Sequence, residues 1–322
     1  MKKIIPMLII SIFLVSLTSA YAADGDMVWS RVYDSNNGES YGIATDSQNN
    51  VIVTGYSGTI KYDSTGTPLW PSAIGIGGNG VAVDSQNNII VTGSTGTMKY
   101  DSTGTPLWPS AIGISGNGVA VDSQNNIIVI GEGDSYFIEK RDTNGNILWD
   151  KTIDITSGYD YGTGVALDSH DNIVVTGWVS DPDPEINYAS CTVKLSPSGS
   201  EILRIYDNSG SRWSYKVAID SYDSIVLAGG KYDPSGDNYQ WLTVKYDSSG
   251  NKIWERGYDF TLGAHDDAYD VAVDSQNNII VTGYVFNSTE KNYFTIKYQG
   301  GSPRSKSLPI AQILKILRKN KE

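Results

Sequence analysis

The sequence predicts an all-β fold, a six-bladed β-propeller in which each blade is a four-stranded antiparallel sheet. Three observations lead to this prediction. One block of sequence occurs six times along the 322 residues. The copies are spaced at about 40–50 residues, which is typical of propeller blades. The composition, with 34 Gly, 21 Tyr and 8 Trp, favours many short strands and tight turns.

The repeated block is clearest at residues 80–93, which read GVAVDSQNNIIVTG, and at 42–55, which read GIATDSQNNVIVTG. Each copy has one aspartate at the same place: Asp46, Asp84, Asp122, Asp168, Asp220 and Asp274. Successive aspartates are 38, 38, 46, 52 and 54 residues apart. β-Branched residues on both sides of a short polar segment predict two strands joined by a tight turn.

A second block completes each unit. Residues 62–70 read YDSTGTPLW, residues 100–108 repeat them letter for letter, and variants stand at 141–149, 195–203 and 246–254. This block predicts a third strand, a turn containing glycine and a fourth strand that carries a tryptophan. Each unit therefore contains four expected strands.

The sixth unit ends at residues 295–298 without a second block. Near the beginning of the chain, residues 25–33 read GDMVWSRVY and resemble the missing strand. We expect this N-terminal strand to complete the last blade and close the ring, which removes exposed sheet edges. Six complete blades in one chain favour a monomer.

These motifs resemble the SBBP repeats of bacterial and archaeal β-propellers over nearly all of residues 25–298. The block at 80–93 is also similar to the strand–turn–strand core of NHL-type propellers. The block at 62–70 is similar to the blade motif of quinoprotein-like propellers, in which the tryptophan docks between blades. The resemblance implies a propeller that is exported or held at the cell surface, but no particular reaction, because propellers host many unrelated functions.

Residues that recur in every unit are expected to be structural, because a residue that each blade needs usually stabilises the blade. The six aspartates could form a calcium-binding or catalytic ring, but we expect them to cap turns by accepting backbone hydrogen bonds. The tryptophans of the second block are expected to fill the core between blades rather than to bind sugar: Trp29, Trp70, Trp108, Trp149 and Trp254.

The beginning of the chain has the features of a signal peptide. Two lysines precede the apolar residues 4–17, and the small residues Ala20 and Ala22 fit a cleavage site. We therefore expect residues 1–22 to be removed and residues 23–300 to form the propeller. The protein is then exported to the periplasm, the cell surface or the exterior.

Charge differs between the body and the tail. The net charge of the chain is −12, and nearly all of the acidic residues lie in the expected propeller. We therefore expect the propeller to repel nucleic acid and anionic surfaces. Residues 301–322 are basic, and their apolar residues are spaced for one face of a helix. This tail is either an amphipathic helix on a membrane surface or partner, or a solvated terminus.

The long loops are expected on one face of the propeller. In a four-stranded meander, the loops between second and third strands and those between blades open on the same side, and these loops vary most in length. Their aromatic and acidic residues suit an envelope polysaccharide or an extracytoplasmic protein, although the aromatics could instead pack the loops down. The candidate ligand-binding residues are Trp178, Tyr188, Tyr232, Tyr239, Trp241, Tyr284, Trp213 and Tyr269.

The sequence contains few candidate metal ligands or cofactor motifs. With one Cys and two His, a cysteine-rich or multi-histidine centre is not expected. Asp181, Asp183 and Glu185 alternate as candidate calcium ligands, but the prolines between them fit a compact loop poorly. His265 stands beside Asp266 and Asp267 and could ligate a metal with them, but we expect a solvated loop, because a zinc site normally has three or four protein donors. No cofactor is expected, with calcium as the alternative.

Three functions remain open from the sequence. The first is a non-enzymatic scaffold that binds through the long-loop face. The second is a propeller lyase or a glycoside hydrolase that uses loop carboxylates, although no catalytic pair can be assigned. The third is a passive structural protein of the envelope.

Overall fold

The computed structural model describes residues 40–131, 135–183, 186–234, 238–259, 265–286 and 291–300. These residues form 21 β-strands and contain no helix, so none of them forms a helix that could cross a membrane. The expected signal peptide (1–22), the expected closing strand (25–33, with Trp29) and the basic tail (301–322) lie outside the described residues.

The strands form six separate antiparallel sheets, in each of which strands that follow one another in the chain are neighbours. Three sheets have three described strands each: β1 (Ser40–Thr45), β2 (Val51–Gly55) and β3 (Gly58–Tyr62); β4 (Gly80–Val83), β5 (Ile89–Gly93) and β6 (Gly96–Tyr100); and β19 (Asp267–Val273), β20 (Ile279–Phe286) and β21 (Lys291–Tyr298). Three sheets have four strands each: β7 (Gly116–Val121), β8 (Ile127–Gly131), β9 (Tyr136–Arg141) and β10 (Ile147–Ile153); β11 (Asp160–Leu167), β12 (Ile173–Ser180), β13 (Tyr188–Leu195) and β14 (Glu201–Asp207); and β15 (Arg212–Ile219), β16 (Ile225–Asp233), β17 (Asn238–Tyr246) and β18 (Lys252–Tyr258).

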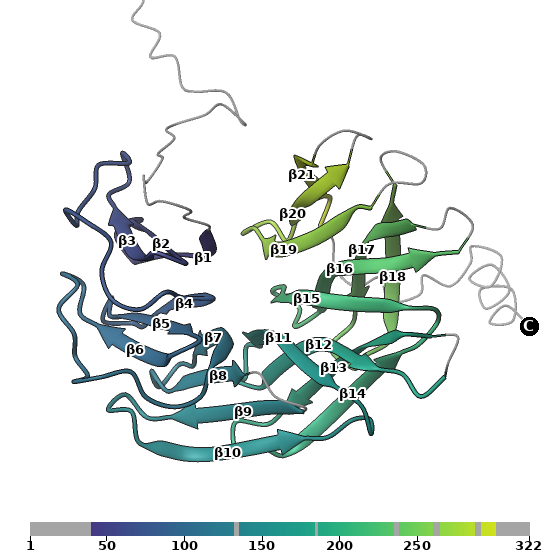
Figure 1. The fold of residues 1–322 in the computed structure, drawn as a ribbon, viewed down its shortest axis with the longest axis horizontal. Helices are drawn as coiled ribbons and strands as arrows, with labels where there is room; N and C mark the ends of the chain where they lie inside the picture. The colour runs from purple at the N-terminus through teal and green to yellow at the C-terminus, as the bar shows by residue number, and fades with distance from the viewer. Residues whose placement is uncertain are drawn as a thin grey trace, which may run out of the picture.

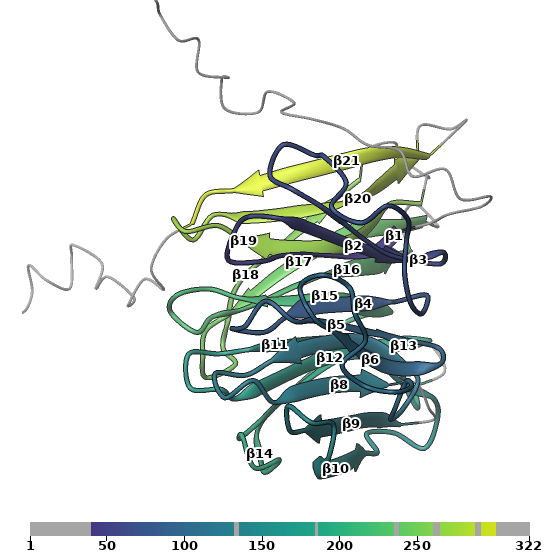
Figure 2. The ribbon, with the colours of Figure 1, turned by 90° about the vertical axis from the view of Figure 1, so that its left-hand side faces the viewer.

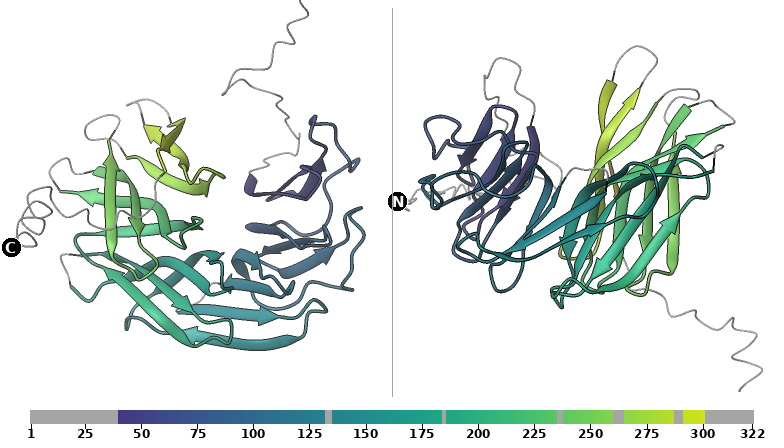
Figure 3. Two further views of the ribbon diagram at one scale, coloured as in Figure 1. Left: turned by 180° about the vertical axis from the view of Figure 1, so that it is seen from behind. Right: turned by 60° about the horizontal axis from the view of Figure 1, so that its bottom comes forward.

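The six sheets lie in chain order around a common centre, with the first strand of each sheet innermost (Figure 1). These inner strands contact one another in the order β1, β4, β7, β11, β15 and β19. Figure 2 and Figure 3 show the same order from the side and from behind. Among the described residues the arrangement is an incomplete ring, with β1–β3 at one end and β19–β21 at the other (Figure 1). Buried branched residues such as Ile128, Val175 and Val226 fill the spaces between sheets.

The turn between the first and second strands is built in the same way in every sheet. In the first sheet, Asp46 Oδ1 accepts hydrogen bonds from the backbone N–H groups of Gln48 and Asn50, each over 2.9 Å. Asn49 adopts a φ of 60°, a left-handed conformation that Asn and Asp tolerate better than most residues. The residues at this position are Asn49, Asn87, Asn125, Asp171, Asp223 and Asn277. The six aspartates therefore cap the turns.

The same aspartates form ion pairs with lysines, which the sequence did not suggest. These pairs are buried in the first five sheets, whereas the Asp274–Lys297 pair of the last sheet is partly exposed. Asp46 Oδ2 lies 2.9 Å from Lys61 Nζ on β3, and the two side chains are only 1% and 3% exposed. The lysine belongs to the T-x-K segment of the third strand, and each sheet has its own pair with Lys61, Lys99, Lys140, Lys194, Lys245 or Lys297. Burial disfavours the charged carboxylate, but hydrogen bonds from Lys61 and Asn50 outweigh it and lower the pKa of Asp46 to about 2.

Polar contacts also join each turn to the next sheet. The backbone N–H of Ser47 donates to Asn87 Oδ1 over 3.0 Å, and that of Ser85 donates to Asn125 Oδ1 over 2.9 Å. The equivalent bond recurs between the next three pairs of sheets. Lys61 Nζ continues from its own aspartate to the carbonyl oxygen of Ser102 in the next sheet, 3.1 Å away. One repeated set of side chains thus closes a turn and connects neighbouring sheets.

The fourth strand position differs between units. In the first two units, this segment pairs with the third strand only at isolated bridges, such as Tyr62 with Pro68 and Thr59 with Ile74. Prolines on both sides of the tryptophan, Pro68 and Pro71 in the first unit, explain the difference, because proline has no N–H for the ladder. The later units have no proline there and form the continuous strands β10, β14 and β18.

The tryptophans of the second block lie at the contacts between sheets. Trp70 and Trp108 are 4% and 6% exposed and belong to one apolar cluster. Trp70 lies against Gly104 of the next sheet, where an added Cβ would lie 3.1 Å from the indole ring. Trp149 is half-buried and donates from Nε1 to the Pro197 carbonyl in the next sheet over 3.1 Å. The half-buried Trp254 packs beside Tyr298 of the last sheet.

We predict that Trp108→Ala lowers the free energy of unfolding by about 3–5 kcal/mol, because it removes a large buried side chain between two sheets. Urea denaturation monitored by far-UV circular dichroism measures this change. An unfolding midpoint equal to that of the wild type would contradict the assigned role.

We also predict that stability falls as the pH is lowered from about 5 towards 2. The pKa of Asp46 is about 2 in the folded protein and about 3.9 in an unfolded chain. The unfolded state therefore binds more protons in this window, and stability present above pH 4 is lost as the pH falls. Hydrogen bonding also outweighs burial to lower the pKa of Asp84 and Asp122, which adds to the effect. Equal unfolding free energies at pH 6 and pH 3 would contradict this prediction.

Candidate functional site

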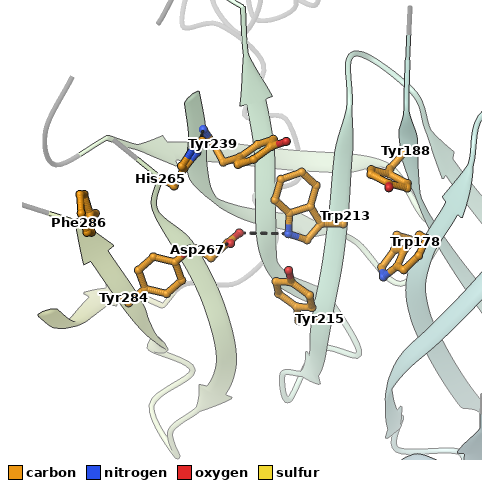
Figure 4. Close-up of a pocket in the computed structure, with 9 residues that line it drawn as sticks. All are labelled: Trp178, Tyr188, Trp213, Tyr215, Tyr239, His265, Asp267, Tyr284 and Phe286. Carbon is orange, nitrogen blue, oxygen red and sulfur yellow. Dashed lines mark hydrogen bonds between the residues drawn. The ribbon is translucent and has the colours of Figure 1, made fainter. Parts of the chain in front are cut away.

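A pocket of about 530 Å³ opens between the last three sheets, on the side of the long loops. Side chains from the ends of β12, β13, β15, β17, β19 and β20 point into it (Figure 4). Nine residues line it: Trp178, Tyr188, Trp213, Tyr215, Tyr239, His265, Asp267, Tyr284 and Phe286. Seven of the nine are Trp, Tyr or Phe, so the walls of the pocket are mainly aromatic.

The repeat explains how several of these side chains reach the pocket. Trp178 and Tyr284 each follow the last glycine of the IVVTG or IIVTG segment, where the second strand extends towards the loop face. In the fifth unit the same position is Gly230. The indole of Trp213 occupies that space, because a Cβ at Gly230 would lie within 2.6 Å of its ring. A glycine in place of an aromatic therefore allows Trp213 to lie at the middle of the pocket.

The centre of the pocket is the pair of Trp213 and Asp267. Trp213 Nε1 donates to Asp267 Oδ1 over 3.1 Å, and the hydroxyl of Tyr284 donates to Asp267 Oδ2 over 3.4 Å. The residues Trp213 and Asp267 are 8% and 7% exposed. Figure 4 shows the carboxylate between Tyr284 on one side and Trp213 with Tyr215 on the other. The carboxylate is thus held by neutral donors and surrounded by rings.

Further rings extend the pocket on both sides of this pair. Tyr239 meets Trp213 edge to face, with ring centroids 5.1 Å apart, and lies 4.7 Å from the ring of His265. At the other end, Trp178 and Tyr188 also meet edge to face at 5.0 Å. The outer face of Trp178 stacks on Tyr161 at 4.7 Å. The aromatic side chains hold one another in place, which gives the pocket a preformed shape.

The electrostatic character of the pocket is negative. Burial, and to a smaller extent the nearby Asp267 charge, raises the pKa of Tyr215 and the pKa of Tyr284 well above the ordinary value for tyrosine. Both hydroxyls therefore stay protonated at neutral pH. The nine described residues that line the pocket include Asp267 but no lysine or arginine. Asp266 is fully buried beside the pocket, and its Oδ1 accepts a hydrogen bond from the Phe286 backbone.

Five of the eight ligand-binding residues proposed from sequence line this pocket: Trp178, Tyr188, Trp213, Tyr239 and Tyr284. Two others lie beside it. Tyr232 meets Tyr239 edge to face at 5.7 Å, and Tyr269 packs between Tyr215 and Tyr284 at 5.2 and 5.5 Å.

The remaining residue, Trp241, is a core residue and does not reach the loop face. It is 0% exposed, and its Nε1 donates to Thr243 Oγ1 within the same strand. Its apolar neighbours come from β16, β19 and β20. This burial leaves no face of the indole open to a ligand, so Trp241 is not part of the candidate site.

The sequence did not identify Asp267 as a pocket residue. Sequence alone places it beside His265 as a metal neighbour, whereas in the structure the carboxylate lies beside Trp213. Tyr215 and Phe286 were also absent from the sequence-based set of candidate residues. Their positions in the repeat could have identified these residues as neighbours of the loop face. Tyr215 and Asp267 lie near the beginnings of inner strands, and Phe286 lies at the end of β20.

Asp181, one of the candidate calcium ligands, already accepts hydrogen bonds from β14 and from its own loop. Asp181 Oδ2 accepts a hydrogen bond from the Tyr206 hydroxyl over 2.6 Å, and Asp181 Oδ1 accepts one from the Asp183 backbone over 2.8 Å. Glu185 lies outside the described residues. Asp168, His170 and Asp223 bring ligand atoms within 4.8 Å of one another, but Asp168 already pairs with its own sheet's lysine at 2.7 Å.

Comparisons with known proteins identify the fold. A scan of protein-family models finds no match, and a search of curated proteins finds no relative. Among solved structures, the WD40 propeller domain of Doa1 has a TM-score of 0.57 at 12% identity, covering 82% of this chain and 80% of that one. The Dos1 propeller has a TM-score of 0.53 at 10% identity, covering 82% of this chain and 71% of that chain. A protein of unknown function from Bacteroides caccae has a TM-score of 0.51 at 13% identity, covering 80% of this chain and 88% of that one. Together with the circular order of the six antiparallel sheets, this similarity shows a β-propeller fold.

Proposed function

We propose that the protein is an exported, non-enzymatic binding scaffold that recognises an envelope polysaccharide or an extracytoplasmic protein through the aromatic pocket. The observation that carries this proposal is the convergence of seven aromatic side chains from three sheets on one pocket at the long-loop face. Concave sites lined by aromatics with a few polar groups are typical of ligand recognition. Removal of residues 1–22 would release the protein outside the cytoplasm, as a monomer.

The same proposal includes closure of the propeller. The last sheet has three described strands, whereas the three sheets before it have four. The segment 25–33 matches the fourth-strand pattern, so it would pair beside β21 and bring the first and last sheets together. Six blades of this kind form a rigid support for the pocket. The basic tail, 301–322, would remain outside the ring to contact a membrane surface or a partner.

Hydrolysis and elimination fit the pocket less well. A glycoside hydrolase needs two carboxyl groups facing the substrate, roughly 5–10 Å apart, but Asp267 is the one carboxylate among the nine described lining residues. Propeller lyases that resemble the NHL group use several metal-bound histidines, and the pocket lining has only His265. A passive envelope protein would need no such pocket.

We predict that Trp178→Ala weakens ligand binding at least about tenfold, because aromatic anchors in a pocket contribute most of the binding energy. The measurement is isothermal titration of the purified protein with envelope polysaccharides and with extracytoplasmic proteins of the host. The matched control is Tyr56→Ala. Tyr56 occupies the place of Trp178 in the first unit, is 71% exposed and lies outside the pocket.

Full binding by Trp178→Ala with an unchanged melting temperature would contradict a role for the pocket. An equal loss in Tyr56→Ala would assign binding to the whole loop face instead. Failure of every polysaccharide and protein to bind the wild type would favour the passive structural role.

A further inference from the structure

The pocket combines one negative charge with an unusual density of ring faces. The indole N–H of Trp213 and the hydroxyl of Tyr284 both donate hydrogen bonds to the Asp267 carboxylate. A carboxylate at 7% exposure has lost much of its hydration. A positive charge brought into the pocket would therefore gain more from Asp267 than it would at the open surface.

The rings around Asp267 favour the same kind of ligand. Aromatic faces carry negative potential and attract ammonium and guanidinium groups held within about 6 Å of the ring centre. Trp213 and Tyr215 lie on one side of the carboxylate and Tyr284 on the other (Figure 4). The hydroxyl protons of Tyr215 and Tyr284 are retained at neutral pH, as described above, so all three rings act as neutral walls. A cation entering between them meets ring faces and a carboxylate together.

The rest of the molecule adds to this preference. The chain has 36 acidic residues against 24 basic ones, so its long-range field raises the local concentration of cations and lowers that of anions. Beside the pocket, the buried Asp266 adds a second carboxyl group. A neutral sugar could donate hydrogen bonds to these carboxylates but would gain no long-range charge attraction, and an anionic polymer would be repelled.

We propose that the pocket selects a cationic group, an alkylated ammonium or a guanidinium, and that Asp267 and the rings of Trp213, Tyr215 and Tyr284 hold it. This inference rests on the proposed function and names the ligand chemistry of the same site. The cation belongs either to a small ammonium compound or to a lysine or arginine side chain of a partner protein. A cavity of about 530 Å³ has room for more than the charged head group, so neighbouring parts of the ligand would contact Trp178 and Tyr188.

The test compares ligands of equal shape and different charge. Choline is titrated into the full-length protein beside 3,3-dimethylbutan-1-ol, its neutral isostere, with tryptophan fluorescence and calorimetry as readouts. Nα-acetyl-lysine and Nα-acetyl-arginine N-methylamides test the protein side-chain source. We expect at least one cation to bind about tenfold or more tightly than the neutral isostere, as a desolvated cation–π site with a carboxylate requires.

The matched variants are Asp267→Asn and Asp183→Asn. Asparagine at 267 keeps an oxygen for the Trp213 N–H and removes the charge. Asp183→Asn alters the net charge by the same amount as Asp267→Asn. Asp183 is exposed on the same side of the molecule but does not line the pocket, so this variant separates the effect of net charge from that of the pocket carboxylate. We expect Asp267→Asn to lose the preference for the cation and Asp183→Asn to retain it.

Two results would overturn the inference. One is equal affinity of the wild type for choline, both amides and the neutral alcohol, a comparison that needs no variant to fold. The other is a cation preference that persists in folded Asp267→Asn. A polysaccharide that binds through Trp178 without any cation preference would refute the cation inference and leave the proposed function standing.

Discussion

The pair of an aspartate and a lysine, which is buried in the first five sheets, is the interaction on which the rest of the structure depends. In each sheet the aspartate caps the turn between the first two strands and meets a lysine of the third strand, as Asp46 meets Lys61 at 2.9 Å. Such a pair stabilises only when its remaining hydrogen-bonding positions are satisfied, since both ions have lost water. Here Asn50 and the backbone complete the carboxylate, and a carbonyl of the next sheet completes the ammonium. The same pair therefore fixes the strands of one sheet and its distance to the next.

This repeated interaction divides the molecule into two faces with different roles. The face with the capped turns has nearly the same sequence in every unit, because the pair, the cap and the bond to the next sheet all need the same residues. The opposite face has no such requirement, and its loops differ in length. On this face, over the last three sheets, aromatic residues and Asp267 converge on a pocket. The repeated support thus leaves the loops of the other face free to vary in length and composition.

The repeat made most of this fold predictable, and the departures have physical causes. The repeat predicted the pairing of successive strands and the turn-capping role of the aspartates, because both depend on residues that are close in the sequence. The ion pairs were missed because Lys61 and Asp46 are partners across a sheet, and nothing local links them. Two prolines per unit prevented a regular fourth strand in the first two sheets. Loop composition indicated the face on which the pocket lies, but not that Trp241 points into the core while Asp267 faces Trp213.

A double-mutant cycle on the third sheet tests the central role of the buried pair most directly. Asp122 and Lys140 lie 2.8 Å apart and are nearly fully buried. Asp122→Asn and Lys140→Met should each lower the free energy of unfolding by about 3–5 kcal/mol, because each leaves a buried charge without its partner. The double variant should lose less than the sum of the two by at least about 1 kcal/mol. Strictly additive losses, measured by urea denaturation, would show that the pair does not act as one unit and would contradict this account.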